Sequence, residues 1–314
     1  MIKIKLKTLL PSRPDDMHKG QRGKLLIIGG YVTAQEAAAP SPFQERFGIS
    51  VLQNFDLNYT GAPALAALGA LRTGAGVVTL LSYPEVCEAC AAKLFELVYL
   101  PLSESDQWLK AALSKADNYQ AAVIGPGLGR SKEAMLFTIG MWQQWPNKLL
   151  VDGDGLYALS VVRDNLQPRA DAVITPHEGE AARLLNLTAQ EIRADRNNSA
   201  KKLADIFGCA VLKGHNTLIA SNNSELEEIN YGGPELAVPG SGDVLAGCIG
   251  AYLANGLNSF DAAVLGASIH GMAGDLLREA YGPDGTLASE IADSLRPAIK
   301  NLRDLKKFRK FKRF

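Results

Sequence analysis

Residues 121–129, AAVIGPGLG, join a short apolar run to a turn that contains three glycines. A short apolar run bounded by glycine and proline is typical of a buried strand. Glycine permits tight turns and lets the backbone approach a ligand closely. The stretch therefore predicts a buried strand that ends directly in a potential binding loop.

The same combination recurs along the chain. Further short apolar runs alternate with longer helical patterns, at 24–28, 77–81, 149–151, 172–174, 209–212 and 217–220. Alternating strands and helices predict an α/β fold with a mostly parallel sheet. Several runs end in polar or glycine-rich turns, at 29–30, 152–155, 175–177 and 213–215. Because ligands bind outside the carboxyl ends of strands in open α/β sheets, we expect the functional site at these turns.

The composition is that of a soluble globular protein. Of the 314 residues, 47% are hydrophobic and 21% are charged. The 33 Lys and Arg residues balance 33 Asp and Glu residues, so no overall field draws the molecule to nucleic acid or acidic lipid. We therefore expect neither a nucleic-acid partner nor a membrane partner. No internal repeat or low-complexity linker divides the chain, which predicts a single domain over residues 1–314.

The cysteines and the N-terminus both predict a cytoplasmic protein. Four cysteines are too few for a disulfide framework in a chain of this length. Cys87 and Cys90 form a CxxC, but no second ligand pair completes a zinc site, so we interpret them as part of an alanine-rich helix. Over residues 1–10, apolar residues and Lys alternate with period two, unlike the apolar core of a signal peptide. Residues 244–260 are interrupted by glycines and predict a buried helix instead of a membrane span.

Two segments do not fit the alternation of strands and helices. Residues 31–58 begin alanine-rich, break at Pro40 and Pro42, and then carry three of the ten phenylalanines. Such an excursion is a lid, an oligomer contact or a disordered insertion. The tail, residues 300–314, holds five Lys, three Arg and one Asp, a local charge of +7. Its interleaved phenylalanines suit an RNA or membrane contact, whereas the simpler interpretation is the frayed end of the last helix.

The most informative stretch is Gly240-Ser241-Gly242-Asp243, followed by an apolar helical run. Glycines at the start of a buried helix let backbone N–H groups converge on an anion, and the helix dipole adds to that attraction. Asp243, in the first turn, is placed to accept a proton from a hydroxyl that attacks a phosphate. The alternative is that Ser241 or Asp243 merely caps the helix.

Two common nucleotide-binding signatures are absent from the sequence. There is no P-loop motif, and the turn at 125–129 lacks the last glycine of the Rossmann fingerprint. His177 lies in a TPHEGE run with two carboxylates, although a lone histidine is usually structural. No His and Cys spacing suggests a metal held by protein side chains. We expect Mg²⁺ to arrive with a nucleotide, because phosphate transfer requires charge neutralisation.

Together these motifs resemble those of the NAD(P)H-hydrate dehydratases. The matching stretches stand in order and cover most of the chain: YTGAP at 59–63, LRTGAG at 71–76, GPGLG at 125–129, TPHEGE at 175–180, VLKGHNT at 211–217 and GSGD at 240–243. The resemblance implies a ribokinase-like fold, which is a three-layer α/β/α sandwich. It also implies one catalytic domain with an insertion at 31–58 and a basic tail at 300–314.

The resemblance further implies an activity and its residues. Members of the family restore NADH or NADPH from its hydrate (NADHX or NADPHX). They phosphorylate the hydroxyl with ADP or ATP and then eliminate phosphate, helped by the ring nitrogen. The implied assignment is an ADP-dependent (S)-NAD(P)H-hydrate dehydratase, a lyase, in a cytoplasmic homotetramer. Asp243 is implied as the catalytic base. The implied contacts to the hydrate are Ala62, Gly127, Gly129, His177 and Asp243. The implied contacts to ADP or ATP are Lys213, Gly214, His215, Asn216, Thr217, Gly240, Ser241 and Gly242.

The chain departs from the family pattern in three places. The 28 residues at 31–58 stand where relatives have a handful, which inserts a large loop beside the expected substrate site. DGDG at 152–155 replaces the usual Asp-Ala-Asp, which loosens the turn but keeps both carboxylates. Leu236 and Val238 replace the usual Met and Thr and bear on nucleotide preference. The chain also lacks room for the epimerase domain fused to some relatives, so action on one epimer is expected.

Two other functions compete with this interpretation. A ribokinase-like kinase of the thiazole or hydroxymethylpyrimidine type shares the glycine and aspartate loop but has another acceptor. The TPHEGE run and the GAP motif at 61–63 favour the dehydratase over such a kinase. A non-catalytic nucleotide-binding protein, blocked by the insertion at 31–58, is disfavoured by the intact Asp243 and Lys213.

Overall fold

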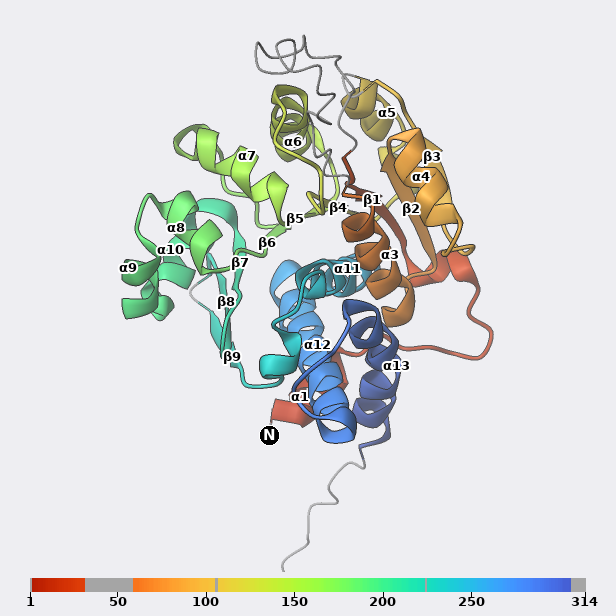
Figure 1. Ribbon diagram of the computed structural model, residues 1–314, viewed down its shortest axis with the longest axis vertical. Helices are drawn as coiled ribbons and strands as arrows, with labels where there is room; N and C mark the ends of the chain where they lie inside the picture. Colours follow the sequence, from red (N-terminus) through yellow and green to blue (C-terminus); the bar gives the residue numbers. More distant parts are fainter. Residues whose placement is uncertain (1, 32–58, 105–106, 224, 306–314) are drawn as a thin grey trace, which may run out of the picture.

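A single sheet lies between two layers of helices in the computed structural model, which describes residues 2–31, 59–104, 107–223 and 225–305 (Figure 1). The described residues form nine strands in the order β3-β2-β1-β4-β5-β6-β7-β8-β9. Neighbours from β3 to β7 are parallel, and β8 and β9 are antiparallel additions. The strands are β1 (Lys24–Ile28), β2 (Val77–Ser82), β3 (Val98–Pro101), β4 (Ala121–Ile124), β5 (Lys148–Val151), β6 (Ala172–Ile174), β7 (Cys209–Leu212), β8 (Thr217–Ser221) and β9 (Leu226–Ile229).

The helices divide between the two faces of the sheet. One layer holds α1 (Ile2–Leu9), α3 (Gly61–Thr73), α4 (Pro84–Ala91), α11 (Ser241–Ala254), α12 (Ser259–Tyr281) and α13 (Ala288–Asp304). The other holds α5 (Trp108–Ser114), α6 (Lys132–Gln144), α7 (Asp154–Val162), α8 (Glu178–Leu185), α9 (Ala189–Ala194) and α10 (Arg196–Phe207). This arrangement confirms the predicted three-layer α/β/α sandwich.

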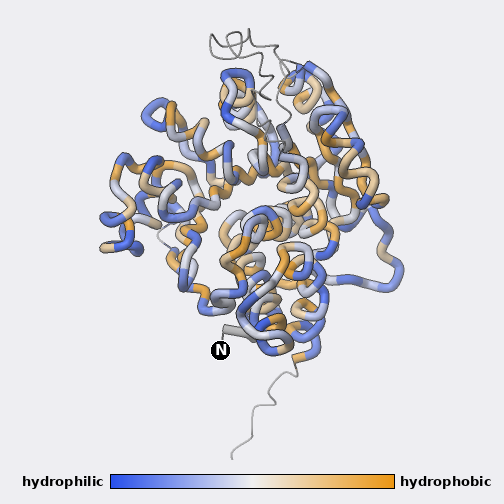
Figure 2. The backbone as a smooth tube through the Cα atoms, in the orientation of Figure 1, coloured by the Kyte–Doolittle hydropathy of each residue, from blue (hydrophilic) through white to orange (hydrophobic). Residues whose placement is uncertain are grey.

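The central strands are buried on both faces. In β1, Leu25 and Ile27 pack into one core, whereas Leu26 and Ile28 pack into the other, and all four are fully buried. This division follows from the period-two alternation of a strand and explains why the strand sequences are continuously apolar. Figure 2 shows the hydrophobic stretches gathered along the interior strands and helices, with hydrophilic stretches at the outer loops.

The seven predicted strands are all present, with ends that differ by at most one residue. The structure adds β3 and β9, which lie at the two edges of the sheet. It also forms a helix, α1, where the N-terminal alternation has period two; Leu6 of this helix is fully buried, and α1 packs against α12 and α13. The single buried helix predicted at 244–260 is interrupted in the structure: residues 244–254 form most of α11, which is buried as predicted, and α12 begins at Ser259.

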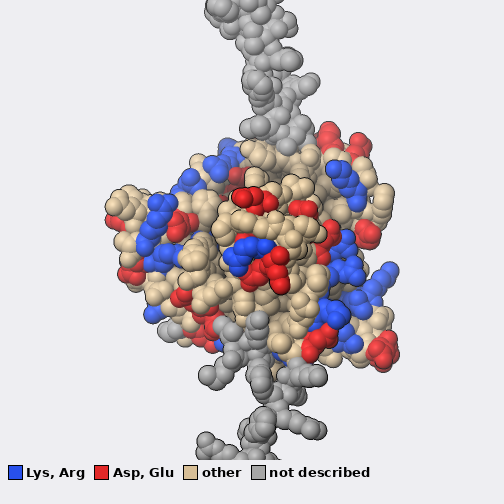
Figure 3. Space-filling model, turned by 60° about the horizontal axis from the view of Figure 1, so that its bottom comes forward, with Lys and Arg blue, Asp and Glu red and all other residues tan. Residues whose placement is uncertain are grey.

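Several features of the described residues bear on smaller predictions. Cys87 and Cys90 lie in α4, and all four cysteines are free and buried. No described helix is long and apolar enough to cross a membrane. Positive and negative side chains are interspersed on the face shown in Figure 3. The insertion lies outside the described residues except for Tyr31, and the tail is described only to Leu305, with α13 reaching Asp304.

Candidate functional site

The loops that follow β5, β6 and β7 meet the first turn of α11 at the carboxyl edge of the sheet. We call the residues that converge there, Asp152, Glu180, Lys213, Gly242 and Asp243, the strand-end site. Asp152 directly follows β5, and Lys213 directly follows β7. β6 lies between these two strands, so the strand order brings together residues that are 61 apart in the sequence.

Lys213 is the positive centre of the strand-end site. Its Nζ lies 2.9 Å from Asp152 Oδ1 and 3.8 Å from Glu180 Oε2. Burial alone lowers the pKa of this lysine, but the negative charges of Asp152 and Glu180 outweigh burial and raise its pKa above the usual value. Lys213 therefore remains a cation at neutral pH, as a phosphate-binding lysine must.

The start of α11 lies directly against this lysine. A Cβ atom added to Gly242 would lie 3.4 Å from Lys213 Nζ and 3.9 Å from Asp152 Oδ2, so the first turn of α11 is in van der Waals reach of both side chains. The N-cap is Gly240, at φ 87°, and no side chain caps the helix. The interpretation that Ser241 or Asp243 caps the helix is therefore wrong. Because no side chain accepts from the N–H groups of the first turn, this end of the helix is suited to bind an anion.

Asp243 is the unpaired carboxylate of the site. It makes no hydrogen bond or ion pair with any described residue, although Lys213 lies near enough to affect its charge. Burial, then the negative charge of Asp152, raises the pKa of Asp243 to about 8; Asp154 and Glu180 add to this effect, and Lys213 opposes it. A carboxyl group with a pKa near neutrality, placed beside an anion site, can accept a proton from a substrate.

The His270 side chain contacts Ser241, in the glycine loop at residues 240–242. Its Nε2 lies 3.0 Å from the carbonyl oxygen of Ser241 and 3.3 Å from the Ser241 hydroxyl. Burial lowers the pKa of His270 to about 4, so the imidazole is neutral. Because a carbonyl oxygen can only accept a hydrogen bond, Nε2 carries the proton and donates a hydrogen bond to the Ser241 carbonyl oxygen.

The residues expected against the hydrate lie along the same edge. A Cβ atom added to Gly127 would lie 3.1 Å from that of Ala62, so these two residues are neighbours. The Gly129 N–H donates to Asp154 Oδ2 at 3.0 Å. The second carboxylate of the 152–155 turn thus holds the 125–129 loop in place.

His177 has a structural role as well as an exposed ring. It is the N-cap of α8, and its Nδ1 accepts hydrogen bonds from the N–H groups of Gly179 and Glu180. The side chain is nevertheless 60% exposed, with Nε2 3.5 Å from Glu180 Oε1. The cap fixes the ring in an orientation that leaves much of it exposed and places Nε2 towards Glu180.

Arg196 shapes the loop expected to bind the nucleotide, and the sequence contained no signal for it. The loop connects β7 to β8 and includes Asn216 at φ 57°. Arg196 donates to the carbonyl oxygens of His215, Asn216 and Leu212, the last two at 3.2 and 3.3 Å. Its Nε lies 3.6 Å from Glu178, which also accepts from Arg193 at 2.6 Å.

Metal-binding capacity at this edge is limited to a few carboxylates. No group of three or more His, Cys, Asp or Glu side chains among the described residues could hold a metal ion. Asp152 and Glu180 do offer carboxylate oxygens beside Lys213. Because both carboxylates face the Lys213 ammonium, they form no open pair for Mg²⁺, an ion that is usually bound through one or two carboxylates together with substrate phosphates.

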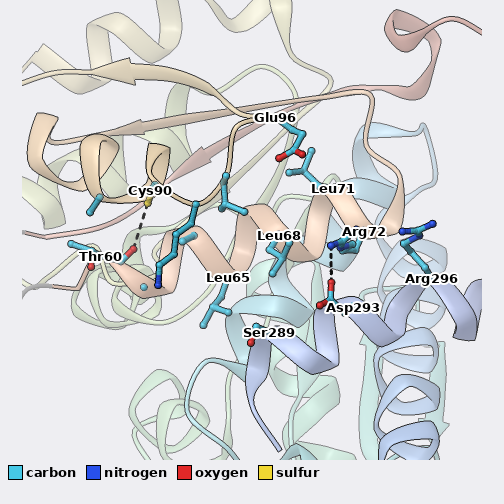
Figure 4. A pocket seen from close by; sticks show the side chains of 15 residues that line it. Thr60, Leu65, Leu68, Leu71, Arg72, Cys90, Glu96, Ser289, Asp293 and Arg296 are labelled. Atoms are coloured by element: carbon cyan, nitrogen blue, oxygen red, sulfur yellow. Dashed lines mark hydrogen bonds and ion pairs between the residues drawn. The ribbon is translucent and has the colours of Figure 1, made fainter.

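A separate groove of about 970 Å³ lies between α3, α4 and α13 (Figure 4). Leu65, Leu68 and Leu71 line it from α3, and Arg72 pairs with Asp293 of α13 at 2.8 Å. Both partners of this ion pair are solvent-accessible, at 36% and 60% of their side chains. None of the residues expected to contact the hydrate or the nucleotide lines this groove.

Comparisons with known proteins place most of the chain in one family. The family described as NAD(P)H-hydrate dehydratase matches residues 56–297. The ADP-dependent (S)-NAD(P)H-hydrate dehydratase of Neisseria meningitidis is 34% identical over 291 residues, which cover 91% of this chain and 88% of the relative. The bifunctional NAD(P)H-hydrate repair enzyme Nnr of Escherichia coli is 35% identical over 93% of this chain, but the chain spans only half of that protein's length.

The fold comparison agrees with the sequence comparison. The ADP/ATP-dependent NAD(P)H-hydrate dehydratase of Bacillus subtilis, crystallised with ATP and Mg²⁺, superposes with a TM-score of 0.79 at 24% identity. The match covers 96% of this chain and 97% of that one. The predicted ribokinase-like fold is confirmed.

Proposed function

The chain belongs to the NAD(P)H-hydrate dehydratase family, and we propose that it is an ADP-dependent (S)-NAD(P)H-hydrate dehydratase, a lyase that repairs hydrated NADH and NADPH. The observation that carries the proposal is the unpaired Asp243 carboxylate, with a pKa of about 8, in the uncapped first turn of α11. The name of the Neisseria relative supports ADP as the phosphate donor.

Asp243 accepts the proton of the hydrate hydroxyl as the hydroxyl oxygen bonds to the terminal phosphorus of ADP. The bond between that phosphorus and the bridging oxygen breaks, and AMP leaves. Lys213 and the N–H groups at 240–242 stabilise the negative charge on the transferred phosphoryl group. The lone pair of the ring nitrogen then expels phosphate, and loss of a proton from the adjacent ring carbon restores the reduced nicotinamide. No oxidant or reductant is consumed.

The binding assignments follow from this chemistry. We propose that Ala62, Gly127, Gly129 and His177 contact the hydrate, and that residues 213–217 and 240–242 contact the nucleotide. Mg²⁺ is proposed to arrive with the nucleotide, where it would neutralise phosphate charge. On the family resemblance, we further propose that the protein forms a single catalytic domain, assembles as a homotetramer and resides in the cytoplasm.

The test is the recovery of reduced-nicotinamide absorbance when the purified protein meets NADH hydrate, Mg²⁺ and either ADP or ATP. We expect recovery with ADP and none with the Asp243→Asn variant. A phosphorylated product that accumulates from another acceptor would identify a kinase instead. Nucleotide binding without turnover of any acceptor would identify a silenced binding protein.

A further inference from the structure

Two arginines contact the same tyrosine ring near the strand-end site. The guanidinium carbon of Arg130 lies 4.9 Å from the ring centroid of Tyr157, and that of Arg183 lies 5.5 Å from it. The ring is half-buried on α7, whereas both arginines are exposed. Contact with a ring face orients a guanidinium plane and leaves N–H donors at its edge free for an anion.

The arginines flank the place proposed for the hydrate. Arg130 directly follows Gly129, and Arg183 lies on α8, the helix that His177 caps. α7 packs against α8 and begins at Asp154, which accepts the Gly129 N–H (Figure 1). The cluster thus connects the two elements that carry Gly129 and His177, the proposed hydrate contacts on this side of the sheet.

Positive charge exceeds negative charge in this cluster. Arg130 donates to Asp154 Oδ1 at 2.9 Å. The Arg183 guanidinium makes no hydrogen bond or ion pair with any described residue. The neighbouring Arg163 donates to the backbone carbonyls of Arg183 and Leu184 and pairs with Asp164 at 3.2 Å. Of the Arg130 and Arg183 guanidinium groups, only that of Arg130 therefore has a carboxylate partner among the described residues. An oriented guanidinium with unused donors is well suited to phosphate, which it binds through two parallel hydrogen bonds.

We propose that Arg130 and Arg183 bind a phosphate group of the hydrated dinucleotide, an inference that rests on the proposed function. The substrate offers this chemistry from two sources. The pyrophosphate bridge is present in both NADH and NADPH hydrates, whereas the additional ribose phosphate is present only in the NADPH hydrate. The first source makes the cluster a general substrate-binding site, and the second makes it the determinant of preference for the NADPH hydrate.

The experiment compares Arg183→Gln with Arg130→Gln and with the control Arg296→Gln, an exposed arginine on α13. For each protein, kcat and KM are measured with NADH hydrate and with NADPH hydrate, and KM is measured for ADP. We expect Arg183→Gln to raise KM for the hydrate by about tenfold or more, as loss of a charged hydrogen bond does. The KM for ADP and the kinetics of Arg296→Gln stay at wild-type values. An equal loss with both hydrates assigns the pyrophosphate, and a loss confined to the NADPH hydrate assigns the ribose phosphate.

Unchanged KM values for both hydrates in Arg183→Gln and Arg130→Gln would overturn the phosphate site. Failure of the proposed function is distinguishable, because the unsubstituted protein would then restore neither hydrate. In that event, NADH and NADPH binding, measured by the fluorescence of the reduced nicotinamide, decides the question. Equal affinities of wild type and Arg183→Gln for both dinucleotides would again overturn the site.

Discussion

Charged side chains are paired differently in the groove between α3, α4 and α13 and in the strand-end site. In the groove, Arg72 and Asp293 form a one-to-one ion pair that is open to solvent. In the strand-end site, Lys213 lies against both Asp152 and Glu180, whereas Asp243 pairs with none of the residues that the structure describes, and the pKa of Asp243 rises to about 8. The large groove therefore offers space, whereas the strand-end site offers an unbalanced set of partly buried charges. Partly buried charges that are not matched one to one are the better indicator of a catalytic site, because they shift pKa values to the range in which a group can transfer protons.

The largest effect should come from removing the unpaired carboxylate. Asp243→Asn keeps the size of the side chain but cannot accept a proton, so we expect kcat to fall by about 10²–10⁴-fold. Asp293→Asn, the same change in the groove, should alter kcat by less than about twofold, because its ion pair is exposed. Initial rates of NADH recovery measure both. Equal losses in the two variants would contradict the contrast between the regions.

The next largest effect should come from removing the positive charge of Lys213. Lys213→Met removes the charge proposed to bind phosphate, and we expect the KM for ADP to rise by about 10–100-fold, the worth of a charged hydrogen bond. Arg72→Met in the groove should leave this KM unchanged. The double variant Lys213→Met/Asp152→Asn removes the cation together with the carboxylate 2.9 Å from it, whereas Glu180 is left without the lysine in both variants. The comparison of the two variants separates nucleotide affinity from misfolding caused by the unpaired Asp152 carboxylate. Wild-type affinity for ADP in a folded Lys213→Met protein would remove Lys213 from the nucleotide site.

The unusual pKa of Asp243 predicts the pH dependence of the enzyme. Asp243 acts as a base only when it is deprotonated, and its pKa is raised to about 8. The value of kcat/KM should therefore increase about tenfold per pH unit well below this pKa and level off above it. Asp152→Asn removes a negative neighbour and should move the midpoint to lower pH, whereas Asp293→Asn should not move it. A flat profile between pH 6 and pH 8 would show that Asp243 is not the base.

The smallest predicted effect concerns the loop that shapes the nucleotide site. Arg196 and Arg193 both face Glu178, but only Arg196 donates to the carbonyl oxygens of the 213–217 loop. Arg196→Ala should raise the KM for ADP by about five- to tenfold, the worth of one or two hydrogen bonds, and Arg193→Ala should not. Isothermal titration with ADP gives the same comparison without turnover. Equal affinities in the two variants would assign Arg196 to fold stability alone.

Most of the sheet was predictable because its interior strands are buried on both faces. The runs 121–124 and 209–212 are continuously apolar, and each forms a strand with those bounds. The edge strands lacked that signal: β3 has exposed residues at both ends, and β9 contains two adjacent glutamates. The N-terminal alternation gave no helical signal, because α1 packs against α12 and α13, whose contacts the local pattern does not contain.

The location of the site could be predicted from the sequence, but the ion pairs within it could not. Polar turns at strand ends pointed to Lys213 and the 152–155 turn, and the glycines at the start of a buried helix pointed to Asp243. The pairing of Lys213 with Asp152 depends on β6 lying between β5 and β7, an order that the sequence does not state. Arg196 carried no signal because its contacts are to backbone carbonyls, which any residue supplies.

The most direct test of the account is the stoichiometry of one reaction that contains NADH hydrate, ADP and Mg²⁺. AMP, inorganic phosphate and NADH are quantified at the same time points by chromatography and absorbance. The account predicts that the three products appear in equal amounts and that none appears with Asp243→Asn. AMP formed together with a stable phosphorylated product, without phosphate or NADH, would contradict it.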